Sequence, residues 1–161
     1  MRRGRRAAAL VVAIGALVLT YVVASAWADD PSDTAIVAQG SGQCAAGTAQ
    51  IGHGSTGSNA FALSLTGVYN ASCSAAYNKV AGNIRARAVL QKKAGGDWGS
   101  CRDTGIYVNA VTNYFAFIQQ GWGTEPCGGG AYRVKSFNHV KWDGDWHGGD
   151  VYSPSHSWPG G

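Results

Sequence analysis

The densest group of side chains able to carry chemistry lies near the C-terminus of the 161-residue chain. Residues 141–150 combine indoles, carboxylates and an imidazole. Indole rings offer large apolar surfaces that can stack on sugar rings, and carboxylates and imidazoles can hydrogen-bond sugar hydroxyl groups. The pattern therefore indicates a ligand platform, whose candidate residues are Trp142, Asp143, Asp145, Trp146 and His147.

The same residues also fit a structural role as a β-hairpin. Asp143 and Gly144 supply the positive φ values that a two-residue turn needs. Trp142 and Trp146 would then meet as a cross-strand aromatic pair, which stabilises a hairpin by about 0.5–1 kcal/mol. In the platform interpretation, three further tryptophans would extend the binding surface: Trp98, Trp122 and Trp158.

Part of this segment resembles a calcium-binding loop. Asp143, Asp145 and His147 occupy the first, third and fifth positions of such a loop. The twelfth position needs a bidentate glutamate and is Pro154, so the sequence excludes an EF-hand. A looser extracellular calcium site formed by Asp143, Asp145 and Asp150 is the alternative, and no other cofactor or metal is expected.

The sequence lacks the patterns of common hydrolases. Its histidines do not have the i, i+4 spacing of a helical zinc site, and no serine lies in a Gly-x-Ser-x-Gly elbow. Glu125 is the only glutamate, whereas glycosidases place two carboxylates across a cleft. We therefore expect no enzymatic activity; the alternative is a small hydrolase that uses His147 and Asp145.

The N-terminus has the three parts of an export signal. A cluster of arginines precedes an apolar run over residues 7–23, and a small-x-small site follows at residues 26–28. Residues 1–28 are therefore predicted to be a signal peptide, and the mature protein is predicted to be secreted. The alternative is an uncleaved anchor, which would be the only contact with a membrane.

Loss of this leader would leave the chain without net charge. The sequence holds 13 lysines and arginines and 9 aspartates and glutamates, and four of the arginines belong to the leader. The remainder has equal numbers of basic and acidic side chains, which removes the long-range field that steers proteins to nucleic acids or anionic membranes. We therefore expect no nucleic-acid partner.

Four cysteines follow the leader: Cys44, Cys73, Cys101 and Cys127. An even number in an exported chain, with no Cys-x-x-Cys, predicts two disulfides rather than a metal or redox site. Three pairings are open. We favour Cys44–Cys73 and Cys101–Cys127, because each closes a short loop and would stabilise the fold by about 3–4 kcal/mol.

Alternating apolar residues predict a domain built from strands. Phe61, Leu63 and Leu65 form one such pattern, and residues 84–90 and 106–108 form others. Residues 114–118 are apolar throughout, as in a central strand covered on both faces.

Little else in the chain predicts regular structure. Residues 75–80 are the only candidate helix. Residues 29–43 are small and polar and are predicted to be a flexible lead-in, which leaves residues 44–161 as a single domain.

Two predicted strands carry basic residues on their outer faces. Arg85 and Arg87 alternate on one strand, and Arg133 and Lys135 alternate on another. If these strands were neighbours, repulsion between like charges would favour an anion there. The hypothesis that follows is a patch for teichoic acid or another cell-wall anion; the alternative is an outer face exposed to water.

The stretch Gly130–Val134 is similar to the start of the penultimate strand of immunoglobulin-like sandwiches, where a tyrosine, here Tyr132, fixes the corner. The leader, the four cysteines and the stretch Cys127–Arg133 also resemble small exported β-sandwich proteins of high-GC Gram-positive bacteria. The resemblance implies an all-β, immunoglobulin-like β-sandwich with two disulfides outside the cytoplasm. It implies no activity.

Together these features predict a secreted, non-catalytic binding protein. Its expected partner is an extracellular polysaccharide or a cell-wall component, bound through the aromatic hairpin, or a secreted protein. One alternative is an inhibitor of an extracellular hydrolase that acts through a rigid loop at Glu125, Pro126 and Cys127. Another is a structural protein of the envelope or spore surface.

Overall fold

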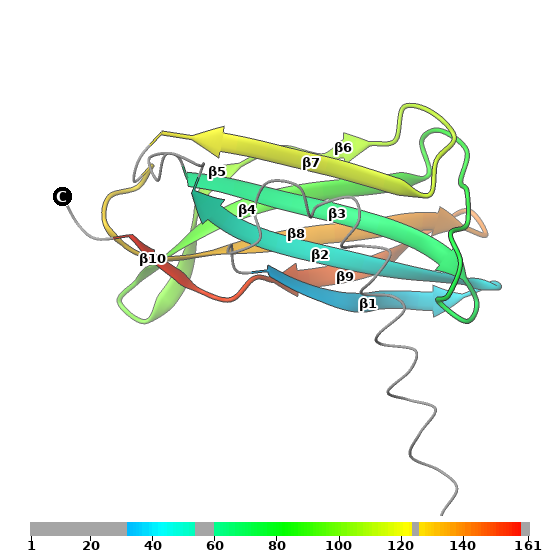
Figure 1. Ribbon diagram of the computed structural model, residues 1–161, viewed down its shortest axis with the longest axis horizontal. Coiled ribbons are helices and arrows are strands. Elements are labelled where there is room, and N and C mark those ends of the chain that lie inside the picture. The colour runs from blue at the N-terminus through cyan, green and yellow to red at the C-terminus, as the bar shows by residue number, and fades with distance from the viewer. Residues whose placement is uncertain (1–31, 54–59, 124–125, 159–161) are drawn as a thin grey trace, which may run out of the picture.

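The computed structural model describes residues 32–53, 60–123 and 126–158, which form two β-sheets packed in layers (Figure 1). The strands are β1 (Ser32–Gly40), β2 (Gln43–His53), β3 (Ala60–Asn70), β4 (Ile84–Ala94), β5 (Asp97–Asp103), β6 (Tyr107–Val108), β7 (Phe115–Trp122), β8 (Gly130–Trp142), β9 (Asp145–Tyr152) and β10 (His156–Trp158). Sheet I has the order β1-β2-β3-β7. Sheet II has the order β10-β8-β4-β5, with β6 beside β4 and β9 beside β8.

The chain crosses between the layers three times. It leaves sheet I after β3, returns after β6 and crosses again after β7, while every strand pair is antiparallel. These crossings put β7 beside β3 and β8 beside β4. The prediction of an all-β, two-sheet sandwich is therefore confirmed.

Strands β1 and β2 were not expected from the sequence. Residues 32–40 were predicted to be part of a flexible lead-in, but they form an edge strand paired with β2. β2 is rich in alanine and glycine, and its alternate residues Ala45 and Ala49 are fully buried. Such small side chains give a weak hydrophobic pattern although they pack well between two sheets.

The predicted helix over residues 75–80 is wrong. This part of the chain is a connection held by two isolated bridges, Tyr69 to Ala76 and Lys79 to Asn113. Within the described ranges, no helix is long and apolar enough to cross a membrane.

The space between the sheets contains two apolar clusters. One is built around Ile51, Leu90 and Tyr132, and the other around Val68, Ile84 and Trp142. The predicted inward direction of Ile84, Ala86, Ala88 and Leu90 is confirmed, because all four are fully buried. Their burial fixes the opposite direction for Arg85 and Arg87, whose side chains leave sheet II on its outer face.

A buried polar group, formed by Ser64, Thr66, Ser136 and Asn138, also lies between the sheets. Thr66 Oγ1 donates to Asn138 Oδ1 over 3.0 Å, and Ser136 Oγ donates to the same oxygen over 3.0 Å. Asn138 Nδ2 donates to the Ser136 carbonyl over 3.1 Å. Because these partners lie on β3 and β8, the hydrogen bonds fix the position of one sheet relative to the other.

Gly47 makes room for this polar group. A Cβ atom at position 47 would lie 2.4 Å from the side-chain Cγ of Asn138, which is fully buried and cannot move without losing its hydrogen bonds. We expect Gly47→Ala to lower the free energy of unfolding by about 1–3 kcal/mol. Urea denaturation would measure it, with Gly99→Ala as the control because its Cβ would meet no atom within 4 Å. Equal stability of the two variants would contradict this explanation.

The large apolar residues of β3 face away from sheet II, although large apolar residues usually point into the space between two sheets. Ala62, Ser64 and Thr66 face sheet II, whereas Phe61, Leu63 and Leu65 form a cluster on the other face with two phenylalanines of β7. β7 itself is an edge strand, so the prediction of a central strand over residues 114–118 is wrong. A further correction concerns Ile106 and Val108, which are exposed.

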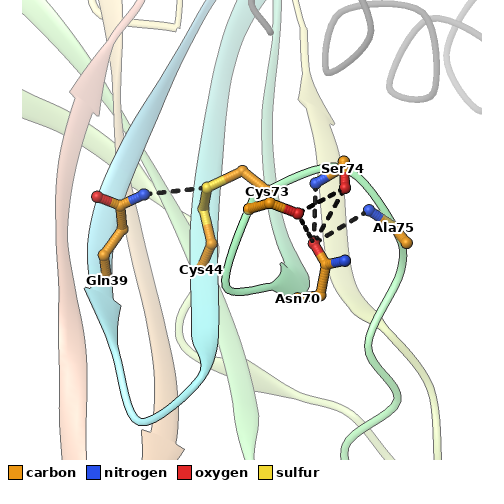
Figure 2. The surroundings of a disulfide bond; sticks show 7 residues. Gln39, Cys44, Asn70, Cys73, Ser74 and Ala75 are labelled. Atoms are coloured by element: carbon orange, nitrogen blue, oxygen red, sulfur yellow. Dashed lines mark hydrogen bonds between the residues drawn. A yellow bond between two sulfur atoms is a disulfide. The ribbon is translucent and has the colours of Figure 1, made fainter.

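Both disulfides have the favoured pairing. Cys44 and Cys73 have Cα atoms 5.4 Å apart, and Cys101 and Cys127 have Cα atoms 6.0 Å apart. The first disulfide joins β2 to the turn after β3. Figure 2 shows how Asn70 closes that turn: its Oδ1 accepts a hydrogen bond from the Ser74 backbone amide over 3.0 Å. With no free cysteine in the chain, the two disulfides indicate an oxidising compartment.

Candidate functional site

The predicted hairpin is confirmed, but the predicted tryptophan pair is wrong. Strands β8 and β9 are joined by Asp143 and Gly144, whose φ values are 52° and 90°. Trp142 lies opposite Asp145, and Trp146 lies opposite Lys141. Because the loop has only two residues, the two indoles leave opposite faces of sheet II.

Trp142 belongs to the interior of the sandwich. Its side chain is only 6% exposed, and its ring stacks on His147 with centroids 4.4 Å apart and planes inclined by 7°. His147 Nε2 is buried and has no hydrogen-bond partner within the described part of the chain. Trp142 and His147 therefore hold the hairpin against the core.

The three aspartates of the proposed calcium site lie apart. Asp143 is in the turn, where it accepts a hydrogen bond from the Ser41 hydroxyl group. Asp145 is opposite Trp142, whereas Asp150 is further along β9, opposite Phe137 and in an ion pair with Lys135 at 2.9 Å. In the described ranges no three His, Cys, Asp or Glu side chains gather as metal ligands.

The outer face of sheet II carries many basic and aromatic side chains, including those of the hairpin that point away from the core. β4 and β8 are neighbours, so the basic rows predicted for these strands do come together. Arg85 lies opposite His139, and Arg87 lies opposite Phe137. The face, which we call the basic–aromatic face, presents the cations Arg85, Arg87, Lys93, Arg133, Lys135 and Lys141 and the rings Trp98, Phe137, Trp146 and Tyr152.

Cations and rings alternate across this face. The Arg85 guanidinium carbon lies 4.2 Å from the centre of the Trp146 ring. The Arg133 guanidinium carbon lies between two rings, 4.5 Å from Trp98 and 4.4 Å from Tyr152. Such stacking keeps like charges on neighbouring strands apart and leaves the guanidinium edges able to donate hydrogen bonds.

A second group of contacts forms the middle of the face. The Lys135 ammonium lies 4.4 Å from the centre of the Phe137 ring, and the Arg87 guanidinium carbon lies 5.0 Å from that centre. Val89 is directly opposite Lys135 and is only 4% exposed. The long side chains therefore pack as a layer over the sheet rather than extending singly into water.

The charges on this face are unequal. Arg87 donates to Asp103 Oδ1 over 2.9 Å, and Lys135 pairs with Asp150, so two cations are matched by carboxylates. The other four cations of the face form no ion pair with a described carboxylate. A chain with balanced charges after its leader thus concentrates positive charge on sheet II.

The pKa values on the face follow from these contacts. Hydrogen bonding to Asp150 raises the pKa of Lys135, and hydrogen bonding to Arg87 lowers the pKa of Asp103. Burial lowers the pKa of His139 below its usual 6.5, and the charge of Arg85 lowers it further, against an opposite effect of Asp150. His139 is therefore a neutral group that can gain charge among cations.

The remaining candidate residues are distributed over the molecule. Trp122 packs against the core, so it does not extend the platform, whereas Trp98 belongs to the basic–aromatic face. Glu125 and the side chain of Trp158 lie outside the described residues. At Pro126, which follows Glu125 in the sequence, the carbonyl accepts a hydrogen bond from Arg102 over 2.9 Å, beside the Cys101–Cys127 disulfide.

Two rings of the site were missed by sequence reasoning. Phe137 is part of the same alternation as Arg133 and Lys135, so its outward direction follows from their pattern. Tyr152 meets Arg133 only because of the register between β8 and β9, which no local pattern gives.

Comparison with protein-family models, with curated proteins and with solved structures finds no match.

Proposed function

We propose that this protein is a secreted, non-catalytic binding protein whose basic–aromatic face binds an anionic, sugar-containing polymer of the cell wall, of the teichoic acid type. The observation that carries the proposal is the stacking of Arg85 on Trp146 and of Arg133 between Trp98 and Tyr152. These cations have no carboxylate partner among the described residues. Arg133 Nε donates to Gln91 Oε1 over 2.9 Å, which leaves the terminal amino groups of this guanidinium for an anion.

The binding mechanism combines two kinds of contact. Guanidinium groups held flat against rings donate paired hydrogen bonds to phosphate or carboxylate oxygens. The exposed parts of Trp98 and Trp146 provide apolar surface for the sugar or polyol between the anions. In this mechanism Trp142 and His147 position the hairpin from inside, Asp143 forms its turn, and Asp145, which is opposite Trp142, does not belong to the face.

An immunoglobulin-like topology and export complete the proposal. The Tyr132 hydroxyl donates to the Gly128 carbonyl four residues upstream, which matches the tyrosine corner of such sandwiches. The three crossings between the sheets support Greek-key connections of the kind that this topology uses. The arginine-rich, apolar N-terminus and the two disulfides support removal of residues 1–28 and a location outside the cytoplasm.

Retention on purified polymers tests the proposal. Oxidised protein would be mixed with sacculi that carry teichoic acid, with sacculi stripped of it, and with neutral chitin and cellulose. We expect retention by the first alone, with loss at high salt because the contacts are ionic. Equal retention by stripped sacculi, or no retention at all, would contradict the proposal and direct attention to the inhibitor or structural alternatives.

Binding should tighten as the pH falls. His139 has a pKa lowered from 6.5 in the free protein, so a fall in pH through this lowered pKa adds a positive charge beside Arg85, which a bound anion stabilises. We expect up to about tenfold tighter binding at pH 5 than at pH 7.5, measured by retention on teichoic acid. In His139→Gln this gain should vanish; an unchanged gain would exclude His139 as its source.

The lowered pKa of His139 makes the polymer-free protein less stable at low pH, whereas it makes polymer binding tighter. The unfolded chain binds the proton first as the pH falls through 6.5, because the folded state holds the pKa of His139 lower. The free energy of unfolding should therefore decrease over this range in the free protein and decrease less when polymer is bound.

A further inference from the structure

Among the residues that the structure describes, β7 is the outermost strand of sheet I and pairs only with β3 (Figure 1). The Val68 amide donates to the Tyr114 carbonyl over 2.7 Å just before β7 begins. Because hydrogen-bonded positions alternate in an antiparallel pair, residues 116, 118, 120 and 122 direct their backbone groups to β3. Phe115, Phe117, Gln119 and Gly121 then leave their N–H and C=O groups at the open edge.

The other outer strands are protected against further pairing. β1 has an irregularity between Ile36 and Ala38, and β5 has a register shift and charged side chains at both ends. On the opposite edge of sheet II, β9 carries two aspartates, and Pro154 follows before β10 begins. Charges, bulges and prolines on edges prevent association with other strands.

β7 has none of these protections. Its sequence Phe-Ala-Phe-Ile-Gln-Gln-Gly-Trp contains no charge or proline, and its register with β3 is regular. The whole stretch 104–124 lacks a charged side chain. Nearby, Val111 is 65% exposed, and a pocket of about 160 Å³ is lined by Tyr107, Val111, Phe115 and Phe117 among others.

We infer that β7 pairs with β7 of a second copy of this chain, antiparallel and about a two-fold axis. An extended, uncharged strand suits this edge best, because the charges of a charged strand would find no partner among the apolar and amide groups of β7. β7 itself fits this requirement, and a two-fold axis brings identical patterns together. With Phe117 opposite Gln119 of the partner subunit, the open-edge residues of both copies exchange hydrogen bonds, and sheet I becomes continuous across the dimer.

This dimer would leave the basic–aromatic faces of both copies open, since they lie on sheet II. It does not depend on the proposed polymer binding. The mass of the oxidised protein in solution, followed by analytical ultracentrifugation over a range of concentrations, tests it directly. We expect a dimer whose fraction rises with concentration and which persists at high salt, because no ion pairs hold it.

Substitutions of Gln119 test the pairing of β7 with β7 directly. Gln119→Pro removes an amide that does not bond to β3, and Gln119→Lys places a charge on the open edge. Both should weaken dimerisation at least tenfold with an unchanged melting temperature; if Gln119→Pro unfolds, Gln119→Lys decides. Ser100→Lys on the edge strand β5 is the control and should dimerise like the wild type. A monomer at all concentrations up to about 1 mM, or dimers of Gln119→Lys as stable as the wild type, would overturn the inference.

Discussion

Replacing both Arg85 and Arg133 by glutamine will lower affinity for teichoic acid by about 100-fold or more. Each arginine is stacked on aromatic rings and has no carboxylate partner among the described residues. A hydrogen bond to a charged group contributes about 1.5–3 kcal/mol, and each 1.4 kcal/mol is about a factor of ten in affinity. Each single replacement should therefore cost about tenfold, measured by retention on sacculi or by calorimetry with soluble polymer.

Lys79→Gln is the matched control for loss of one positive charge. Lys79 lies outside both sheets and donates to Gln43 Oε1 over 2.8 Å, so it does not belong to the basic–aromatic face. We expect its affinity for polymer to stay within about twofold of the wild type, since distant exposed charges are screened by salt. If Lys79→Gln weakened binding as much as Arg133→Gln, general attraction by net charge would explain binding better than a defined site.

The second large effect is on stability, where we expect the two tryptophans of the hairpin to differ. Trp142→Ala should lower the free energy of unfolding by about 3–5 kcal/mol, because it removes a large buried ring and leaves a cavity beside His147. Trp146→Ala removes a partly exposed ring that touches Arg85, so its cost should stay near 1 kcal/mol. Urea denaturation of both variants at one pH would measure the difference.

For polymer binding we expect the reverse: a change at Trp146 should matter more than a change at Trp142. Trp146→Ala should weaken binding several-fold while it remains folded, because Arg85 loses the ring that orients it. Trp142→Phe keeps an aromatic ring in the core and should bind nearly as tightly as the wild type. Normal binding by Trp146→Ala together with weak binding by folded Trp142→Phe would contradict the assignment of the site to the outer face.

The sequence predicts best where large apolar residues alternate with charged ones. In β4, Ile84 and Leu90 point inward, and Arg85 and Arg87 point outward, as expected. The cysteines predict two disulfides, and of the three pairings that the sequence leaves open, the structure has the one favoured for its short loops. These elements suffice to predict a disulfide-bonded sandwich and basic rows on its outer strands.

Other features need the assembled sheets. The alternation of Leu63 and Ser64 does not say which face meets sheet II, and the polar side chain points inward because Ser136 and Asn138 receive it. The face of β3 is therefore decided by a partner on β8, far away in the sequence. Likewise, a continuous apolar run such as residues 114–118 occurs both in central strands and in an edge strand whose outer face is apolar.

The opposite directions of Trp142 and Trp146 follow from local rules alone. If Asp143 and Gly144 are the two residues of the turn, residue 142 must lie opposite residue 145, and residue 141 opposite residue 146. The indoles then fall on opposite faces whatever the rest of the fold does. The stacking of Arg133 between Trp98 and Tyr152 is different, since it joins β5, β8 and β9 and depends on three registers, those of β4 with β5, β4 with β8 and β8 with β9.

The most direct test of polymer binding by the basic–aromatic face is an NMR titration of ¹⁵N-labelled, oxidised protein with soluble teichoic acid. The indole N–H signals report on separate places: Trp98 and Trp146 lie on the face, whereas Trp122 and Trp142 pack toward the core. We predict saturable shifts of the first two signals and of the backbone amides of Arg85 and Arg133, with little change in the other two. No shifts at saturating polymer, or shifts confined to sheet I, would contradict the proposed function.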